Sequence, residues 1–224
     1  MSTPIRVDFI SDVVCPWCAI GLGALEQAIQ RLADEAVVEI NFEPFELNPH
    51  MPQGGQNAVV HIMQKYGSNA ADIARGQNSI RAGGNSVGFH FDFDKRTHFY
   101  NTFDAHRLIF WAGFEGLQRP LSHALFAAYF TDGQNISSHK VLASIASSVG
   151  LSEELANEVL SSNLYANEVR EREFYFTSRG IHSVPVVVLN GRQIITGAQT
   201  ADYYEQALRQ IAEITTALAR GREG

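Results

Sequence analysis

Two cysteines separated by two residues are the strongest chemical signal in the sequence. Cys15 and Cys18 enclose a Pro-Trp pair, and the 224-residue chain contains no other cysteine. Two thiols at this spacing can form a local disulfide, or they can supply half of a zinc site. Zinc usually takes four ligands, and neither a second Cys pair nor a close His pair accompanies this one. We therefore favour redox chemistry and expect no metal site.

The position of the two thiols predicts a different role for each. Apolar residues recur with helical spacing at 25, 28, 29 and 32, and Pro16 suits the first turn of such a helix. Free N–H groups and the helix dipole stabilise a thiolate at a helix N-terminus. We expect Cys15 to be the exposed attacking thiolate, and Cys18 to be the protected thiol that resolves the mixed disulfide. Pro16 and Trp17 tune the redox poise, and Trp17 is expected to form a solvent-facing apolar docking surface.

The elements that must position this pair begin with a β-α-β unit. Residues 5–9 and 38–42 alternate apolar and polar side chains, which predicts a strand on either side of the helix. From residue 50 to 180 helical patterns dominate, apart from a candidate short strand at 89–93 and a predicted helix whose apolar face starts at Phe99.

Strand patterns return after residue 180. A β-branched run at 186–189 and the Asn190-Gly191 turn signal predict a hairpin with residues 193–196. An amphipathic helix follows Thr200 and completes a β-β-α half. We predict an α/β fold in which a helical block is inserted into one small α/β domain.

Composition and charge exclude several classes of function. The chain has 24 acidic and 17 basic residues, for a formal net charge of −7, and the basic residues form no cluster. It is a poor electrostatic match for nucleic acid or an anionic membrane, so we expect neither partner. No apolar run approaches the roughly 18 residues of a membrane span, and residues 1–4 lack the profile of a secretory signal. We expect a cytoplasmic protein; the sequence assigns no oligomeric state.

The order of elements and motifs resembles the thioredoxin fold of the DsbA family. The resemblance spans nearly the whole chain and rests on Cys15-Pro16-Trp17-Cys18 in a β-α-β unit, a helical insertion, and a β-β-α half that begins with Val184-Pro185. It implies a thioredoxin-like domain of residues 1–49 and 181–224 and an inserted helical domain of residues 50–180.

Further matches resemble the FrnE-like branch of this family. They are Ser11-Asp12, Asn101-Thr102, Ala105-His106-Arg107, Gly180-Ile181 and Gly197-Ala198-Gln199. That branch is similar to 2-hydroxychromene-2-carboxylate isomerases and kappa-class glutathione transferases, which usually have Ser where this chain has Cys15. Because this chain retains both cysteines, the resemblance favours the thiol–disulfide branch.

The resemblance implies a cis peptide bond between Val184 and Pro185. A cis turn would leave the Val184 backbone free to pair with an extended substrate beside Cys15, whereas the alternative is an ordinary proline at the start of a strand. Asp12, three residues before Cys15, either relays protons to the thiols or braces the loop.

Three residues are candidate glutathione or substrate contacts. Gln199 and Thr200 precede a helix whose N–H groups can take a carboxylate, as the comparable turn does in the kappa-class relatives; the alternative is simple N-capping by Thr200. Asn48 is a candidate on the resemblance alone. His106 falls on an apolar helical stripe, so we expect a core or inter-domain histidine with satisfied hydrogen bonds rather than a catalytic one.

The favoured function is thiol–disulfide exchange through Cys15 and Cys18 with a thiol- or disulfide-bearing protein or small molecule. No cofactor is expected to be tightly bound, and glutathione is a candidate co-substrate. One alternative is a glutathione-dependent isomerase or transferase of the 2-hydroxychromene-2-carboxylate isomerase or kappa class. The other is a non-enzymatic polypeptide-binding or chaperone-like module. A glutathione-dependent isomerase or transferase needs no resolving thiol, so the presence of Cys18 argues against that alternative.

Overall fold

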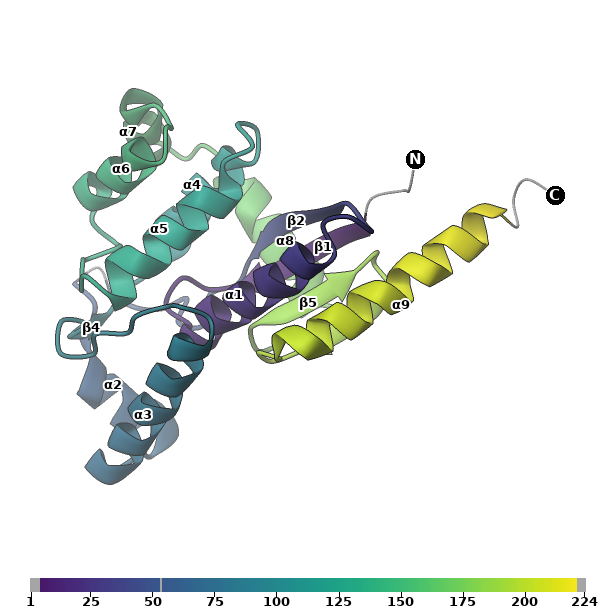
Figure 1. Ribbon diagram of the computed structural model, residues 1–224. Coiled ribbons are helices and arrows are strands. Elements are labelled where there is room, and N and C mark those ends of the chain that lie inside the picture. Colours follow the sequence, from purple (N-terminus) through teal and green to yellow (C-terminus); the bar gives the residue numbers. More distant parts are fainter. Residues whose placement is uncertain (1–4, 53, 221–224) are drawn as a thin grey trace.

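The computed structural model describes residues 5–52 and 54–220, with a sheet built from both ends of this range (Figure 1). The strands are ordered β2-β1-β5-β6; β1 pairs with β2 in parallel and with β5 in antiparallel register, and β5 pairs with β6 in antiparallel register. The bounds are β1 (Ile5–Ser11), α1 (Pro16–Arg31), β2 (Val38–Pro44), β5 (Val186–Leu189), β6 (Gln193–Thr196) and α9 (Ala201–Arg220). This is the predicted β-α-β and β-β-α arrangement of the thioredoxin fold.

Different helices cover the two faces of the sheet (Figure 1). Because side chains alternate along a strand, Val7 and Phe9 join the core on one face and Ile10 the core on the other. Helices α1 and α9 cover the first face, where Tyr204 of α9 is fully buried. Phe176 of α8 (Ala166–Thr177) packs on the second face. Helix α8 therefore covers the sheet, although its residues fall within the range predicted for the helical insertion.

The middle of the chain is mainly helical, as predicted. Its elements are β3 (Gln56–Asn57), α2 (Ala58–Tyr66), α3 (Ala70–Ser86), β4 (His98–Phe99), α4 (Phe103–Ala112), α5 (Gln118–Phe130), α6 (His139–Ser148) and α7 (Glu153–Ser161). Across the described ranges, no helix is both long and apolar enough to cross a bilayer. Residues 1–4 and 221–224, at the outer ends of the predicted thioredoxin-like domain, lie outside the described residues. Residues 1–4 are also the segment that we tested for a secretory signal.

Two local predictions in this region are wrong. Residues 89–93 form no strand, because the rings of Phe89, Phe91 and Phe93 turn inward and pack on one another and on Phe130 of α5. Phe99 does not begin a helix but lies in β4, which pairs with β3. Helix α4 starts four residues later, at Phe103.

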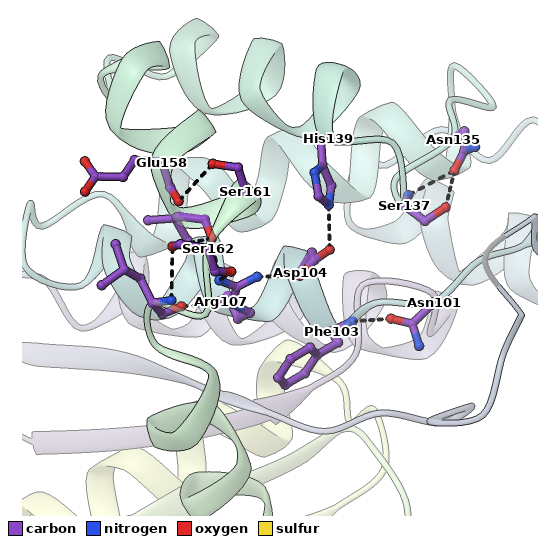
Figure 2. A network of polar contacts seen from close by, with 12 residues as sticks. Asn101, Phe103, Asp104, Arg107, Asn135, Ser137, His139, Glu158, Ser161 and Ser162 are labelled. Atoms are coloured by element: carbon purple, nitrogen blue, oxygen red, sulfur yellow. Dashed lines mark hydrogen bonds and ion pairs between the residues drawn. The ribbon is translucent and has the colours of Figure 1, made fainter.

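Arg107 ties helix α4 to the end of α7 (Figure 2). Its buried guanidinium donates hydrogen bonds to the carbonyl oxygens of Ser162 (2.6 Å) and Leu164 (2.9 Å). Carbonyl groups at the end of a helix lack intrahelical partners, and the helix dipole favours a cation there. The Asp104 carboxylate of α4 accepts a hydrogen bond from Arg107 at 2.7 Å and another from His139 of α6 at 2.9 Å, so it also connects α4 to α6. These contacts join helices α4, α6 and α7 to one another.

Candidate dithiol site

The two cysteines lie where strand β1 passes into helix α1. Cys15 is the N-cap residue, Pro16 occupies the first turn, and the Cys18 N–H donates to the Cys15 carbonyl at 3.0 Å. Both thiols are free. Cys18 is fully buried, as predicted, but Cys15 is only 4% exposed and is therefore not the exposed thiol that we expected. The reason is that Cys15 lies in a groove whose walls cover most of its surface.

The groove has a volume of about 480 Å³ and is bounded on one side by the dithiol loop. Trp17 forms part of its edge and is 42% exposed, which agrees with its predicted apolar surface. Side chains from helices α2 and α3 line another wall, and most of them are apolar. They are Ile62, Tyr66, Ile73 and Ile80, with the polar Asp72 and Gln77. A larger hollow of about 700 Å³ runs along α1 and α5, but neither cysteine lines it, so the smaller groove is the one that can carry thiol chemistry.

The Val184–Pro185 turn lies directly against the first thiol. The peptide bond between these residues is cis, the geometry that we expected. The Cys15 thiol donates to the Val184 carbonyl at 3.6 Å, and the Gly197 N–H donates to the Pro185 carbonyl at 2.8 Å. The fold thus brings together residues from opposite ends of the chain, and Val184 also lines the groove.

Asp12 is a fully buried carboxylate beneath the dithiol loop. It accepts hydrogen bonds from the backbone N–H groups of Leu47 (2.7 Å) and Val14 (3.4 Å), so it braces two loops. The His106 Nε2 atom lies 3.6 Å from Asp12 Oδ1 and 3.1 Å from the Phe45 carbonyl oxygen. His106 is the hydrogen-bonded core histidine that we expected, but its contact with Asp12 was not foreseen, because no sequence pattern relates these two positions.

Burial and charge shift the pKa values of the groups around Asp12. Burial raises the pKa of the Cys18 thiol well above its usual range, and the hydrogen bond and charge of Cys15 and the charge of Asp12 add to the effect. Burial alone would lower the pKa of His106, but its hydrogen bond to Asp12 and the charges of Asp12, Glu173 and Glu46 outweigh it, so this pKa is raised. The site thus favours a neutral Cys18 and a charged His106.

The three candidate glutathione contacts lie outside the groove at Cys15. Asn48 accepts a hydrogen bond from Lys65 at 2.7 Å, Gln199 donates to the Thr196 carbonyl at 2.9 Å, and the Thr200 hydroxyl accepts from the Tyr203 N–H at 3.3 Å at the start of α9. None of the three lines the groove at Cys15. Thr200 has the contact expected of an N-cap.

One functional candidate, Arg96, was not identified from the sequence. Arg96 lines the groove and is only 6% exposed, among the rings of Phe93, Phe99 and Tyr129. A basic residue in an irregular segment gives no signal of burial, so only the packing shows it. Within the described ranges, no group of three or more His, Cys, Asp or Glu side chains could hold a metal ion.

Comparisons with known proteins agree with this fold. A family model described as a DSBA-like thioredoxin domain matches residues 6–209. The chain is 31% identical to the probable DsbA oxidoreductase SCO1869 from Streptomyces coelicolor, over 92% of this chain and 89% of the other, with a TM-score of 0.86.

Two further solved structures share the fold at lower identity. One is a 2-hydroxychromene-2-carboxylate isomerase, 17% identical over 95% of this chain and 98% of the other, with a TM-score of 0.68. The second is the cytosolic disulfide reductase DsbM from Pseudomonas aeruginosa with GSH, 17% identical over 96% of this chain and 99% of the other, with a TM-score of 0.62.

Proposed function

Because this chain belongs to the DSBA-like thioredoxin domain family, we propose that it is a thiol–disulfide oxidoreductase that works through Cys15 and Cys18. The arrangement of the two thiols carries this proposal. Cys15 caps a helix inside an open groove, and Cys18 is fully buried one turn further along the same helix. The thiol that lines the groove can therefore meet a bound substrate first, and the fully buried thiol can complete the exchange.

The exchange proceeds in two balanced steps. The Cys15 thiolate attacks one sulfur of a substrate disulfide; a bond forms to Cys15, the substrate S–S bond breaks, and the departing thiolate takes a proton. Cys18 then loses its proton and attacks the Cys15 sulfur, which releases the second substrate thiolate to be protonated in turn. The protein dithiol gives two electrons and two protons, and one disulfide becomes two thiols. Oxidation of a substrate dithiol is the same sequence reversed.

Asp12 and His106 support the second step. The negative charges of Cys15 and Asp12 both raise the pKa of Cys18, and the first of these charges disappears once Cys15 forms the mixed disulfide. Cys18 then ionises more readily, at the moment when it must attack. We propose that Asp12, with His106 as its counter-charge, receives this proton.

The substrate is proposed to bind between the two predicted domains, in the groove that the dithiol loop and helices α2 and α3 form. Glutathione is the first co-substrate to test, because the solved DsbM that shares this fold contains GSH. We propose a cytoplasmic location on the same basis. The glutathione-dependent isomerase alternative is less favoured, because Cys18 would have no role in it.

A Cys18→Ser variant tests the mechanism. The reduced variant should form a mixed disulfide through Cys15 with oxidised glutathione or a disulfide-bearing protein, and the adduct should accumulate because no second thiol resolves it. Intact-mass spectrometry measures the adduct, and Cys15→Ser is the matched control that should form none. Turnover by Cys18→Ser at the rate of the parent protein would contradict the dithiol mechanism and favour the glutathione-dependent isomerase or transferase.

A further inference from the structure

Arg96 places an unusual buried cation in the wall of the groove. The residue is 6% exposed, and its Nε and Nη1 atoms are buried with no hydrogen-bond partner. Its guanidinium carbon lies 4.8 Å from the centre of the Phe99 ring and 5.1 Å from that of Phe93. The guanidinium also interacts with the Tyr129 hydroxyl, where it opposes the upward shift in pKa that burial causes.

These contacts do not balance the charge of Arg96. Within the described part of the chain, no carboxylate lies within ion-pair distance of it; Asp72, which also lines the groove, pairs with Arg75 instead. Aromatic faces attract a guanidinium, but each contact contributes only about 0.5–2 kcal/mol. Buried charges are normally paired, and unsatisfied donors on a charged group are costly. An anion supplied from outside the chain would satisfy both requirements.

We propose that Arg96 binds a carboxylate of the substrate, and that the substrate is a small aromatic or apolar disulfide that carries this carboxylate. This inference rests on the proposed function, since Cys15 in the same groove is the group that reacts with the disulfide. A hydrogen bond from a guanidinium to a carboxylate is charge-assisted, and two nitrogens of Arg96, Nε and Nη1, have donors without a partner, either of which can donate to a carboxylate oxygen.

The rest of the groove fits the same substrate class. Its volume of about 480 Å³ lies within the range of about 300–1,000 Å³ typical of small-molecule sites. Trp17, Ile73 and Ile80 supply apolar contacts along its length. The Cys15 thiolate attacks the substrate disulfide, while Arg96 holds the carboxylate and so fixes which sulfur it reaches; the leaving thiolate takes a proton, and Cys18 completes the exchange as described above.

The test compares two aromatic disulfides that differ in charge. Dithiobis(nitrobenzoate) carries carboxylates and dithiodipyridine carries none, and reduced protein supplies both electrons in a single turnover that releases a coloured thiol. With Arg96→Gln, the rate constant for dithiobis(nitrobenzoate) at limiting concentration should fall about tenfold or more, the equivalent of one hydrogen-bonded charge. The rate constant for dithiodipyridine should change less than twofold.

Arg81→Gln is the matched control. Arg81 also lies over the Phe93 ring, with its guanidinium carbon 5.1 Å from the ring centre, but it does not line the groove. This substitution removes the same charge from the same aromatic cluster and should leave both rate constants within twofold. An equal loss with the carboxylate disulfide in Arg81→Gln would show that only long-range charge matters and would overturn the assignment.

The remaining outcomes separate this inference from the proposed function. If the unmodified reduced protein reacts with neither disulfide, the dithiol function itself fails. If it reacts with both, and Arg96→Gln slows both equally, the function stands and Arg96 is only a structural cation. Should Arg96→Gln not fold, inhibition of the dithiodipyridine reaction by nitrobenzoate and by its amide is compared in the unmodified protein. The carboxylate should inhibit at least tenfold more strongly, and equal inhibition would refute the proposal.

Discussion

Replacing Asp12 with asparagine should make the stability of the protein depend on pH in a new way. The asparagine side chain is a neutral group of nearly the same shape and would still accept the hydrogen bond that the Leu47 N–H donates to Asp12 at 2.7 Å. The change removes the charge that does most to raise the pKa of His106. Without it, burial should dominate and keep His106 neutral.

The sign of the effect follows from the raised pKa of His106. A group whose pKa is raised on folding stabilises the folded state below its ordinary pKa, here about 6.5, and that stabilisation is lost as the pH rises through the raised value. Breaking a buried ion pair costs about 3–5 kcal/mol, and both side chains are almost fully buried. We therefore expect Asp12→Asn to lose about 3 kcal/mol of unfolding free energy near pH ~5.5.

This loss should shrink as the pH rises, by up to about 1.4 kcal/mol per pH unit. Above the raised pKa of His106, the unmodified protein holds a buried carboxylate without a counter-charge. There the variant should be equally stable or more stable.

Urea denaturation across this pH range measures the difference. Both proteins carry Cys15→Ser and Cys18→Ser, so that no thiol titrates. Asp8→Asn is the matched control, because Asp8 lies on β1, the strand that ends just before Asp12, and pairs at 2.9 Å with an arginine, Arg6, instead of a histidine. A destabilisation by Asp12→Asn that is constant from pH ~5.5 to ~9 would refute the coupling to His106.

Three further outcomes follow from the geometry. Limiting alkylation near neutral pH should label Cys15 before Cys18, since the second thiol is fully buried with a raised pKa; peptide mapping with the label mainly on Cys18 would reverse their roles. Arg107→Met should lower the unfolding free energy by about 3 kcal/mol or more in urea titrations, because the buried Val159 carbonyl and the part-buried carbonyls of Ser162 and Leu164 lose a charged donor; a loss below about 1 kcal/mol would contradict that. Gly84→Ala should destabilise the protein by about 1–3 kcal/mol, because the added methyl would lie 2.5 Å from a backbone carbonyl oxygen. Gly76→Ala, on the same helix, has open space and should stabilise the protein slightly. Equal thermal midpoints for the two variants would refute this.

Local patterns predicted the sheet well. Alternation identified β1 and β2, and the Asn190-Gly191 signal identified the β5–β6 turn, in which both residues have positive φ (49° and 64°) as this turn requires. These elements could be predicted because their residues satisfy local geometry and burial together. The segment at 89–93 has the same alternation, but its rings pack on α5, and only the tertiary arrangement decides between the two outcomes.

The same distinction between local pattern and tertiary packing applies to the residues of the candidate site. Cys15 and Cys18 could be found from their spacing, and the proximity of Val184 to Cys15 came from the family resemblance rather than from any local pattern. The contact of His106 with Asp12 and the burial of Arg96 could not be predicted. Both depend on how elements distant in sequence pack together, and a single sequence carries no record of those pairings.

The pairing of β1 with β5 also sets the order in which the protein can be completed during synthesis. Val7 pairs with Leu189, so one edge of the first strand has no partner until about 180 more residues have been made. At a translation rate of about 5–20 residues per second, this delay is on the order of 10–40 s. Both thiols are made early in that time and the helical region is made during it, but the carbonyl that the Cys15 thiol meets comes only at its end. A nascent chain that ends before Val184 therefore has both thiols but an incomplete site, and the addition of the last strands completes it.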